Sequence, residues 1–312
     1  MGFGAVRTIP VNGVGPEDVL LDPHGRVYTG LEDGRIIRVD DEGRRIDTVA
    51  DTEGRPLGLE FLGEDELVVC DALRGLLSVR LGDGAVRVLA TEAAGQPLTF
   101  CNNAAVDSEG TVYFTDSSTR FGIEKWRDDL IEQTGTGRLL RRTPDGVIDV
   151  LAAGLQFANG VALPPDESFV AVAETSACRV RRVWLDPRRE GATDLLVDEL
   201  AGFCDNISTG SDGLIWVTQA SPRVASLDLV RRLPAALRRV VRGLPTSLQP
   251  SPRRSCGVLG VSAEGEIVHD LGGEIEGFRL LTGVREMAGS LYFGSLEGNC
   301  VAVTDVGTAA PR

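Results

Sequence analysis

The chain has 312 residues, of which 42% are hydrophobic and 25% charged, proportions typical of a globular protein with a core of adequate size. Its formal net charge of -14, from 46 acidic and 32 basic residues, argues against nucleic acid as a partner, because a phosphate-binding surface needs excess positive charge. The N-terminus lacks the pattern of a secretion signal, and no apolar run approaches the roughly 18 residues of a membrane span. The six cysteines are scattered, so we expect a cytoplasmic protein with free, buried thiols.

A turn followed by a β-branched and aromatic run recurs six times along the chain. The six copies span residues 22–28, 63–69, 107–114, 165–172, 211–217 and 288–293. An apolar run precedes each copy, and one or two short alternating segments follow most of them, which gives four strands in a repeat of about 40 to 57 residues. This pattern predicts an all-β fold, a six-bladed β-propeller with four antiparallel strands per blade, formed as a single domain by residues 1–312.

The start of the chain and two insertions depart from the repeat. Residues 6–10 form a strand-like segment that we expect to complete the last blade. Residues 123–133 predict a short helix, and residues 227–250 predict proline-broken helical pieces with one apolar and one arginine-rich face. We interpret the second insertion as a helix packed on the rim or as a substrate lid, in preference to a membrane-surface helix.

Polar residues stand at matching places, ahead of or within the first strand, in four repeats: Glu17, Asn102, Asn159 and Asp205. The first strand of a propeller blade lines the central tunnel, so we expect these side chains to converge on the axis. Two carboxylates and two amides offer the hard oxygen ligands that calcium prefers, although another divalent cation would also fit. Taken alone, each residue is better explained by an ordinary turn, so the metal site depends on the four matching positions together. With only two histidines, a zinc site or a Ser-His-Asp triad is hard to build.

Motifs in order along nearly the whole chain, including GPED at 15–18, YFTDSSTR at 113–120 and FANGVA at 157–162, carry a family resemblance. The chain resembles the six-bladed propeller superfamily of senescence marker protein/gluconolactonase, paraoxonase, diisopropyl-fluorophosphatase and strictosidine synthase. Within it, the strictosidine synthase-like proteins are the most similar.

The resemblance implies a metal site. Hydrolytic members of the superfamily hold a divalent cation, usually calcium, with a Glu, two Asn and an Asp, and the matching residues here are Glu17, Asn102, Asn159 and Asp205. Asn206 resembles a further ligand of paraoxonase-like sites. Asp18 matches one ligand of the family's second, structural calcium, but Asn103 stands where an aspartate would. This departure puts a second calcium in doubt.

Two further departures limit the implied chemistry. Residues 55–60 contain no histidine where paraoxonases carry a histidine dyad, so water activation by histidine is not expected. The catalytic glutamate of true strictosidine synthases falls within residues 277–284, where Arg279 stands near its place and Glu276 lies three residues away. The absence of that glutamate argues against a Pictet–Spengler condensation.

The function predicted from these observations is calcium-dependent hydrolysis of a small organic substrate in the tunnel, of the lactonase or esterase type. Asp205 is the candidate general base or nucleophile, with a purely ligating role as its alternative. A condensing enzyme of the strictosidine synthase type and a non-catalytic binding propeller with a structural metal are the alternatives. Glu174, inside an apolar strand, is expected to be a hydrogen-bonded carboxylate whose pKa is raised by burial, which leaves a catalytic role open.

Overall fold

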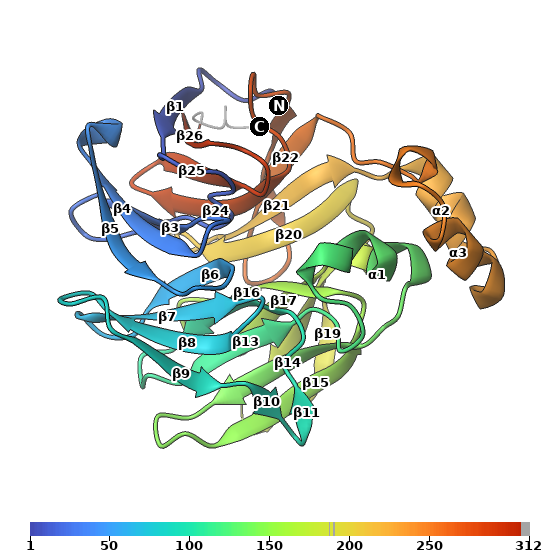
Figure 1. Ribbon diagram of the computed structural model, residues 1–312, viewed down its shortest axis with the longest axis horizontal. Helices are drawn as coiled ribbons and strands as arrows, with labels where there is room; N and C mark the ends of the chain where they lie inside the picture. The colour runs from blue at the N-terminus through green and yellow to red at the C-terminus, as the bar shows by residue number, and fades with distance from the viewer. Residues whose placement is uncertain (187, 190, 307–312) are drawn as a thin grey trace.

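The computed structural model (Figure 1) is built from six four-stranded antiparallel sheets arranged in a ring, which confirms the predicted six-bladed propeller. It describes residues 1–186, 188, 189 and 191–306, so residues 307–312 of the predicted domain lie outside the described residues. Blades 1 to 3 contain β2 (Leu20–Leu21), β3 (Val27–Gly30), β4 (Arg35–Asp40) and β5 (Arg45–Asp51); β6 (Pro56–Phe61), β7 (Glu66–Asp71), β8 (Gly75–Arg80) and β9 (Val86–Ala90); β12 (Cys101–Val106), β13 (Val112–Asp116), β14 (Gly137–Arg142) and β15 (Ile148–Leu155).

The remaining three blades follow the same order from the axis outwards. They contain β16 (Ala158–Ala162), β17 (Phe169–Glu174), β18 (Arg179–Trp184) and β19 (Thr193–Val197); β20 (Gly202–Thr209), β21 (Ile215–Pro222), β22 (Cys256–Val261) and β23 (Ile267–Gly273); β24 (Leu281–Met287), β25 (Ser290–Ser295), β26 (Cys300–Asp305) and β1 (Arg7–Pro10). A separate hairpin, β10 (Glu92–Ala93) and β11 (Gln96–Pro97), follows blade 2.

The ring is closed by the two ends of the chain. Strand β1 pairs antiparallel with β26, with Arg7 opposite Val303 and Pro10 opposite Cys300, as the sequence predicts. The first strand therefore becomes the outer strand of blade 6, and Figure 1 shows the N-terminus beside this blade. This pairing also protects the outer edge of β26 from pairing with another chain.

Burial follows the position of each strand in its blade. Every residue of the second strand β17 is buried, because neighbouring blades cover both of its faces. The outer strand β9 is mostly exposed or half-buried. Between blades 3 and 4, Tyr113 and Leu139 pack with Val170 and Val172 in one apolar cluster. Trp216 is fully buried, and five of the six cysteines are buried free thiols, Cys300 being half-buried.

The two predicted insertions are helical and lie at the same end of the ring. The first contains the 3-10 turn η2 (Ile123–Lys125) and α1 (Trp126–Glu132). The second runs between β21 and β22 and contains α2 (Ala225–Arg231), α3 (Ala235–Arg242) and the 3-10 turn η4 (Thr246–Leu248). Figure 1 shows the three helices on one side of the propeller. The sequence pattern did not identify β22, because the insertion separates this strand from the rest of its repeat.

The two insertions are joined by polar contacts. The guanidinium of Arg231 donates to the backbone oxygen of Leu130 at 3.0 Å, and Arg242 pairs with Glu132 at 3.1 Å. None of the helices among the described residues is long and apolar enough to cross a membrane.

Candidate functional site

The innermost strands of blades 2 to 6 each carry a β-bulge at the same place. In blade 3 the register moves from Cys101 opposite Asp116 to Ala104 opposite Phe114, so two residues face one, and the other four blades repeat this shift. A bulge bends its strand and re-aims the side chains. The first bulge residue of each blade lines a cavity on the axis, and Glu17, ahead of β2, takes this place in blade 1. We call these six residues the cavity ring: Glu17, Leu57, Asn102, Asn159, Asp205 and Thr282.

The second bulge residue of blades 2 to 6, and Asp18 at the matching place in blade 1, lie behind the cavity ring and do not line the cavity. We call these residues the buried ring: Asp18, Gly58, Asn103, Gly160, Asn206 and Gly283. Polar residues alternate with glycines around the ring. Each glycine lacks a side chain, which leaves room for the polar residue of the next blade to pack against its backbone. A Cβ added at Gly160 would lie 2.6 Å from the Cα of Asn206, and one at Gly283 would lie 2.8 Å from the Cα of Asp18. These close approaches bring the inner strands together around the axis.

Three buried amide oxygens near the base of the cavity, the Oδ1 atoms of Asn102, Asn159 and Asn206, have no hydrogen-bond partner among the described residues. The Nδ2 of Asn159 donates to Thr175 Oγ1 at 3.1 Å, and the Nδ2 of Asn206 donates to both Glu17 oxygens at 3.1 and 3.2 Å. These contacts fix two of the amides with their oxygens unpaired. Leaving a buried acceptor unpaired costs about 1–3 kcal/mol, so oxygens of this kind indicate a place for a ligand.

Two carboxylates share this base, and the pKa of each is raised. Burial raises the pKa of Glu17 well above its usual range, and the charges of Asp205 and Asp18 add to this effect, against the nearby Arg55 and the hydrogen bond from Asn206. Burial raises the pKa of Asp205 to about 7, although a hydrogen bond from Asn159 opposes the shift. In both residues burial disfavours the charged form most, and a bound cation would favour it.

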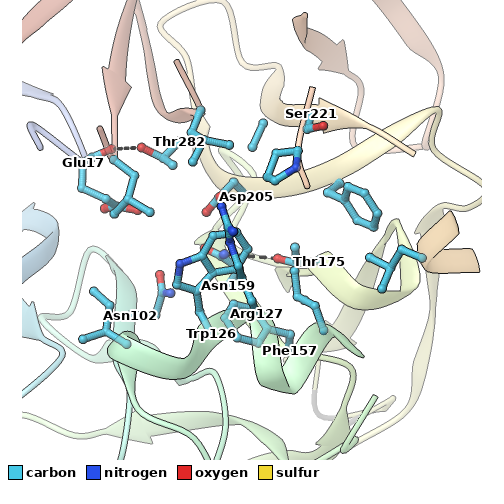
Figure 2. A pocket seen from close by; sticks show the side chains of 18 of the residues that line it. Glu17, Asn102, Trp126, Arg127, Phe157, Asn159, Thr175, Asp205, Ser221 and Thr282 are labelled. Carbon is cyan, nitrogen blue, oxygen red and sulfur yellow. Dashed lines mark hydrogen bonds between the residues drawn. The ribbon is translucent and has the colours of Figure 1, made fainter. Parts of the chain in front are cut away.

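The base of the cavity fits a hard divalent cation. Carboxylate and amide oxygens are the donors that calcium takes, and no imidazole or thiolate accompanies them. Among the described residues there is no group of three or more His, Cys, Asp or Glu side chains suited to a metal ion, so a site here depends on the amides of Asn102 and Asn159. The four residues predicted for the cation are all brought together, as Figure 2 shows. Asn206 lies one layer behind them, where it contacts Glu17.

The walls of the cavity are apolar and come from the blades and from both insertions. Phe100 and Phe157 form an edge-to-face pair with ring centroids 5.5 Å apart. Trp126 of α1 and Leu227 of α2 also line the cavity, which gives the second insertion the lid-like position that we expected as one alternative. Figure 2 shows Trp126 and Phe157 among the side chains that surround the pocket. The arrangement combines a polar, charged base with an entrance for an apolar molecule.

Behind the cavity, the charged groups of the tunnel are satisfied by the protein itself. Asp18 accepts backbone N–H groups of Val19 and Leu59 at 2.9 and 3.1 Å, and the Oδ1 of Asn103 accepts the N–H of Val161 at 3.0 Å. Burial still raises the pKa of Asp18 to about 6, and the charge of Arg285, which pairs with Glu60 at 3.1 Å, acts against this rise. The guanidinium beside Asp18 and the hydrogen bond already accepted by the Oδ1 of Asn103 both argue against a second calcium here.

Glu174 and the two histidines lie outside the cavity ring. The expected rise in the pKa of Glu174 is wrong: burial acts to raise it, but hydrogen bonds from Arg179 and Gln156 and the charge of Arg181 outweigh burial and lower the pKa. Glu174 is therefore an ion-pair partner, with Arg179 and Arg181 each at 2.8 Å. Neither histidine lines the cavity, and His269 stacks on Trp216 instead.

Sequence reasoning missed Leu57 and Thr282, which complete the cavity ring, and Arg127, which lines the wall. The signal for the first two was their place in the repeat, since both stand directly before the glycines of the buried ring. For Arg127 there was no repeat signal, because it lies in an insertion.

Comparisons with known proteins agree with this architecture. A family model described as strictosidine synthase matches residues 102–188, and one described as strictosidine synthase-like, N-terminal, matches residues 4–39. Protein STRICTOSIDINE SYNTHASE-LIKE 10 of Arabidopsis thaliana is 34% identical over 331 residues, covering 94% of this chain and 86% of the relative. The chain belongs to the strictosidine synthase-like family. Another relative, the adipocyte plasma membrane-associated protein of Rattus norvegicus, is 33% identical over 308 residues, covering 90% of this chain and 80% of the relative.

Solved structures share the fold of this family member at low sequence identity. A gluconolactonase from Xanthomonas campestris superposes with a TM-score of 0.70 at 17% identity, covering 97% of this chain and 90% of the other. A calcium-binding protein, regucalcin, from Agrobacterium tumefaciens gives a TM-score of 0.68 at 14% identity, covering 97% and 94%. At such identities the likeness establishes the fold and leaves the chemistry to the site.

Proposed function

We propose that the protein is a hydrolase that depends on a divalent cation, calcium in the first place, and cleaves a small ester or lactone with an apolar body. The observation that carries this proposal is the base of the cavity, where unpartnered amide oxygens and two carboxylates of raised pKa face an apolar space. The gluconolactonase and the calcium-binding regucalcin, which have the same fold, are consistent with it.

The cation would be held by Glu17, Asn102, Asn159 and Asp205. Asn206 would fix the Glu17 carboxylate through its Nδ2, and its unpaired Oδ1 makes it a candidate for a further ligand. When bound, the cation would polarise the carbonyl of the substrate and stabilise the negative charge that develops on its oxygen.

Asp205 is the residue to which we assign proton transfer. It is less buried than the other polar members of the cavity ring, so its carboxylate faces the space where a substrate would lie. It would accept a proton from a water molecule as that water attacks the carbonyl carbon, and return the proton to the leaving oxygen. Direct attack by the carboxylate, or a purely ligating role, are the alternatives for the same residue.

The condensing reaction is disfavoured by the stretch that carries the glutamate in true strictosidine synthases. Glu276 and Arg279 are exposed and do not line the cavity, whereas Leu280 does. No carboxylate from this stretch reaches the cavity to remove a proton. A binding propeller with a structural cation remains the other alternative, and turnover separates it from an enzyme.

The test is a panel of lactones and aryl esters, assayed with protein as purified, after chelation and after calcium is restored. Hydrolysis that chelation removes and calcium restores is the expected result. Turnover that chelation leaves unchanged would contradict the assigned cation chemistry. Calcium binding with no turnover of any member of the panel would favour the binding propeller over the enzyme.

A further inference from the structure

Arg127 on α1 lines the wall of the cavity and has no acidic partner. Among the described residues its guanidinium makes no ion pair or hydrogen bond, and its one ring contact is with Trp126, whose centroid lies 5.2 Å from Cζ. Figure 2 shows the guanidinium end of Arg127 directed over the middle of the pocket. A half-buried arginine without a carboxylate partner is unusual, particularly in a chain with 46 acidic and 32 basic residues.

The other arginines around α1 are paired, so the lack of a partner is specific to this position. Arg120 pairs with Glu132 at 3.3 Å, and Arg242 pairs with the same carboxylate at 3.1 Å. Arg138, in β14 just after the insertion, pairs with Asp116 at 2.6 Å. Each of these guanidinium groups has a structural role that Arg127 lacks.

The charged residues that line the cavity also indicate a ligand site at Arg127. Its lining contains three charged side chains among the described residues, Glu17 and Asp205 at the base and Arg127 on the wall. A divalent cation at the base would offset the two carboxylates and leave the charge of Arg127 uncompensated. The space between base and wall would then favour a molecule with one negative charge.

We propose that Arg127 binds the carboxylate of an anionic substrate, so that the protein acts on esters or lactones of small organic acids. This inference rests on the proposed hydrolase function and adds the class of substrate. The planar guanidinium can donate two parallel hydrogen bonds to a carboxylate. The carboxylate would lie at the wall beside Trp126, the apolar body between Phe100 and Phe157, and the ester carbonyl at the base.

The kinetic test compares two aryl esters of equal size, one neutral and one bearing a carboxylate, in the wild type and in Arg127→Gln. A charge-assisted hydrogen bond contributes about 1.5–3 kcal/mol, so KM for the carboxylated ester should rise roughly 10- to 100-fold in the variant. KM for the neutral ester should change less than about twofold, which is under 0.5 kcal/mol. Arg127→Lys should recover part of the loss.

Arg120→Gln is the matched control, because Arg120 also adjoins α1 but does not line the cavity. It should leave the preference for the carboxylated ester intact. Equal KM changes for both esters in Arg127→Gln, or no change for either, would overturn the assignment of Arg127.

A binding measurement separates this inference from the hydrolase proposal. Benzoate and benzamide, which share a ring and differ in charge, are titrated into the protein in calcium-containing buffer and followed by calorimetry. Benzoate should bind to the wild type and to Arg120→Gln at least tenfold more tightly than to Arg127→Gln, and benzamide should not discriminate between them. This result would support the anion site even if no ester were turned over. Equal benzoate affinity in all three proteins would overturn it.

Discussion

The cavity ring and the buried ring are two polar layers on the same axis, built from adjacent residues of the same strands, yet they are satisfied differently. In the buried ring, Asp18 and Asn103 find backbone N–H donors, and Arg285 supplies a positive charge beside Asp18. In the cavity ring, the oxygens of Asn102 and Asn159 have no partner among the described residues. Asn206 is the exception in the buried ring, because its Oδ1 is unpaired while its Nδ2 donates to Glu17. For the other residues, the difference separates polar groups that hold the fold together from polar groups that await a ligand.

The largest effect should come from Asp205→Asn, which removes the proposed proton acceptor of the cavity ring. We expect kcat for the best ester or lactone to fall by about 10²–10⁴-fold, the usual contribution of a general base. The same chemical change in the buried ring, Asp18→Asn, is the control, and it should alter stability more than kcat. Near-normal turnover in Asp205→Asn would disprove the role.

Among the substitutions considered, removal of the Arg285 guanidinium beside the buried ring should lower stability the most. In Arg285→Met, Glu60 loses its ion-pair partner and Asp18 loses its nearby positive charge. We expect the free energy of unfolding in guanidinium chloride to drop by about 1.5–3 kcal/mol, the range for hydrogen bonds to charged groups, because both side chains of the pair are partly exposed. A loss below about 1 kcal/mol would show that the pair behaves as a surface ion pair.

A matched pair of substitutions compares the two rings directly. Asn102→Leu places in blade 3 the residue that blade 2 has at the same position, and it removes a buried unpaired oxygen. The cation-free protein should keep its stability or gain up to about 1–3 kcal/mol, while calcium affinity falls at least about tenfold, or 1.4 kcal/mol. Asn103→Leu should lower the stability, because it leaves the N–H of Val161 unpaired, and should leave calcium affinity nearly unchanged. Calorimetry measures the calcium affinity of both variants, and chemical denaturation measures their stability. Similar changes in the two variants would refute the distinction between the rings.

The pH dependence of the cation-free protein should be a smaller effect. Burial raises the pKa of Asp205 to about 7 and that of Asp18 to about 6, so between pH 4 and 7 the folded protein binds more protons than the unfolded chain. Stability must therefore fall as pH rises through this window, with a slope of the order of 1 kcal/mol per pH unit. Calcium should flatten the profile, because it stabilises the ionised carboxylates. A stability that rises between pH 5 and 7 without calcium would contradict these shifts.

The sequence predicted the fold well because the signal is repeated. Six copies of one turn and strand pattern predicted the blades, and the short segment that became β1 predicted the closure of the ring. Strand β22 escaped detection because a 33-residue break between β21 and β22 (residues 223–255) holds the helical insertion. Periodicity describes local structure and gives no information on which distant segments rejoin.

The site was predicted in part for the same reason. Glu17, Asn102, Asn159 and Asp205 recur at one place in the repeat, and the structure brings them together around the cavity. Two features could not be read from local patterns. The lowered pKa of Glu174 depends on Arg179 and Arg181, which both pair with its carboxylate. The lack of a partner for Arg127 depends on where α1 packs in the folded protein.

The most direct test of the account is a calorimetric titration of the chelator-treated protein with calcium, repeated on Asn102→Leu and Asn103→Leu. We predict one calcium ion per chain for the wild type and for Asn103→Leu, and at least about tenfold weaker binding, or 1.4 kcal/mol, for Asn102→Leu. No binding to the wild type, or binding that Asn102→Leu leaves unchanged, would show that the unpaired oxygens of the cavity ring do not form a cation site.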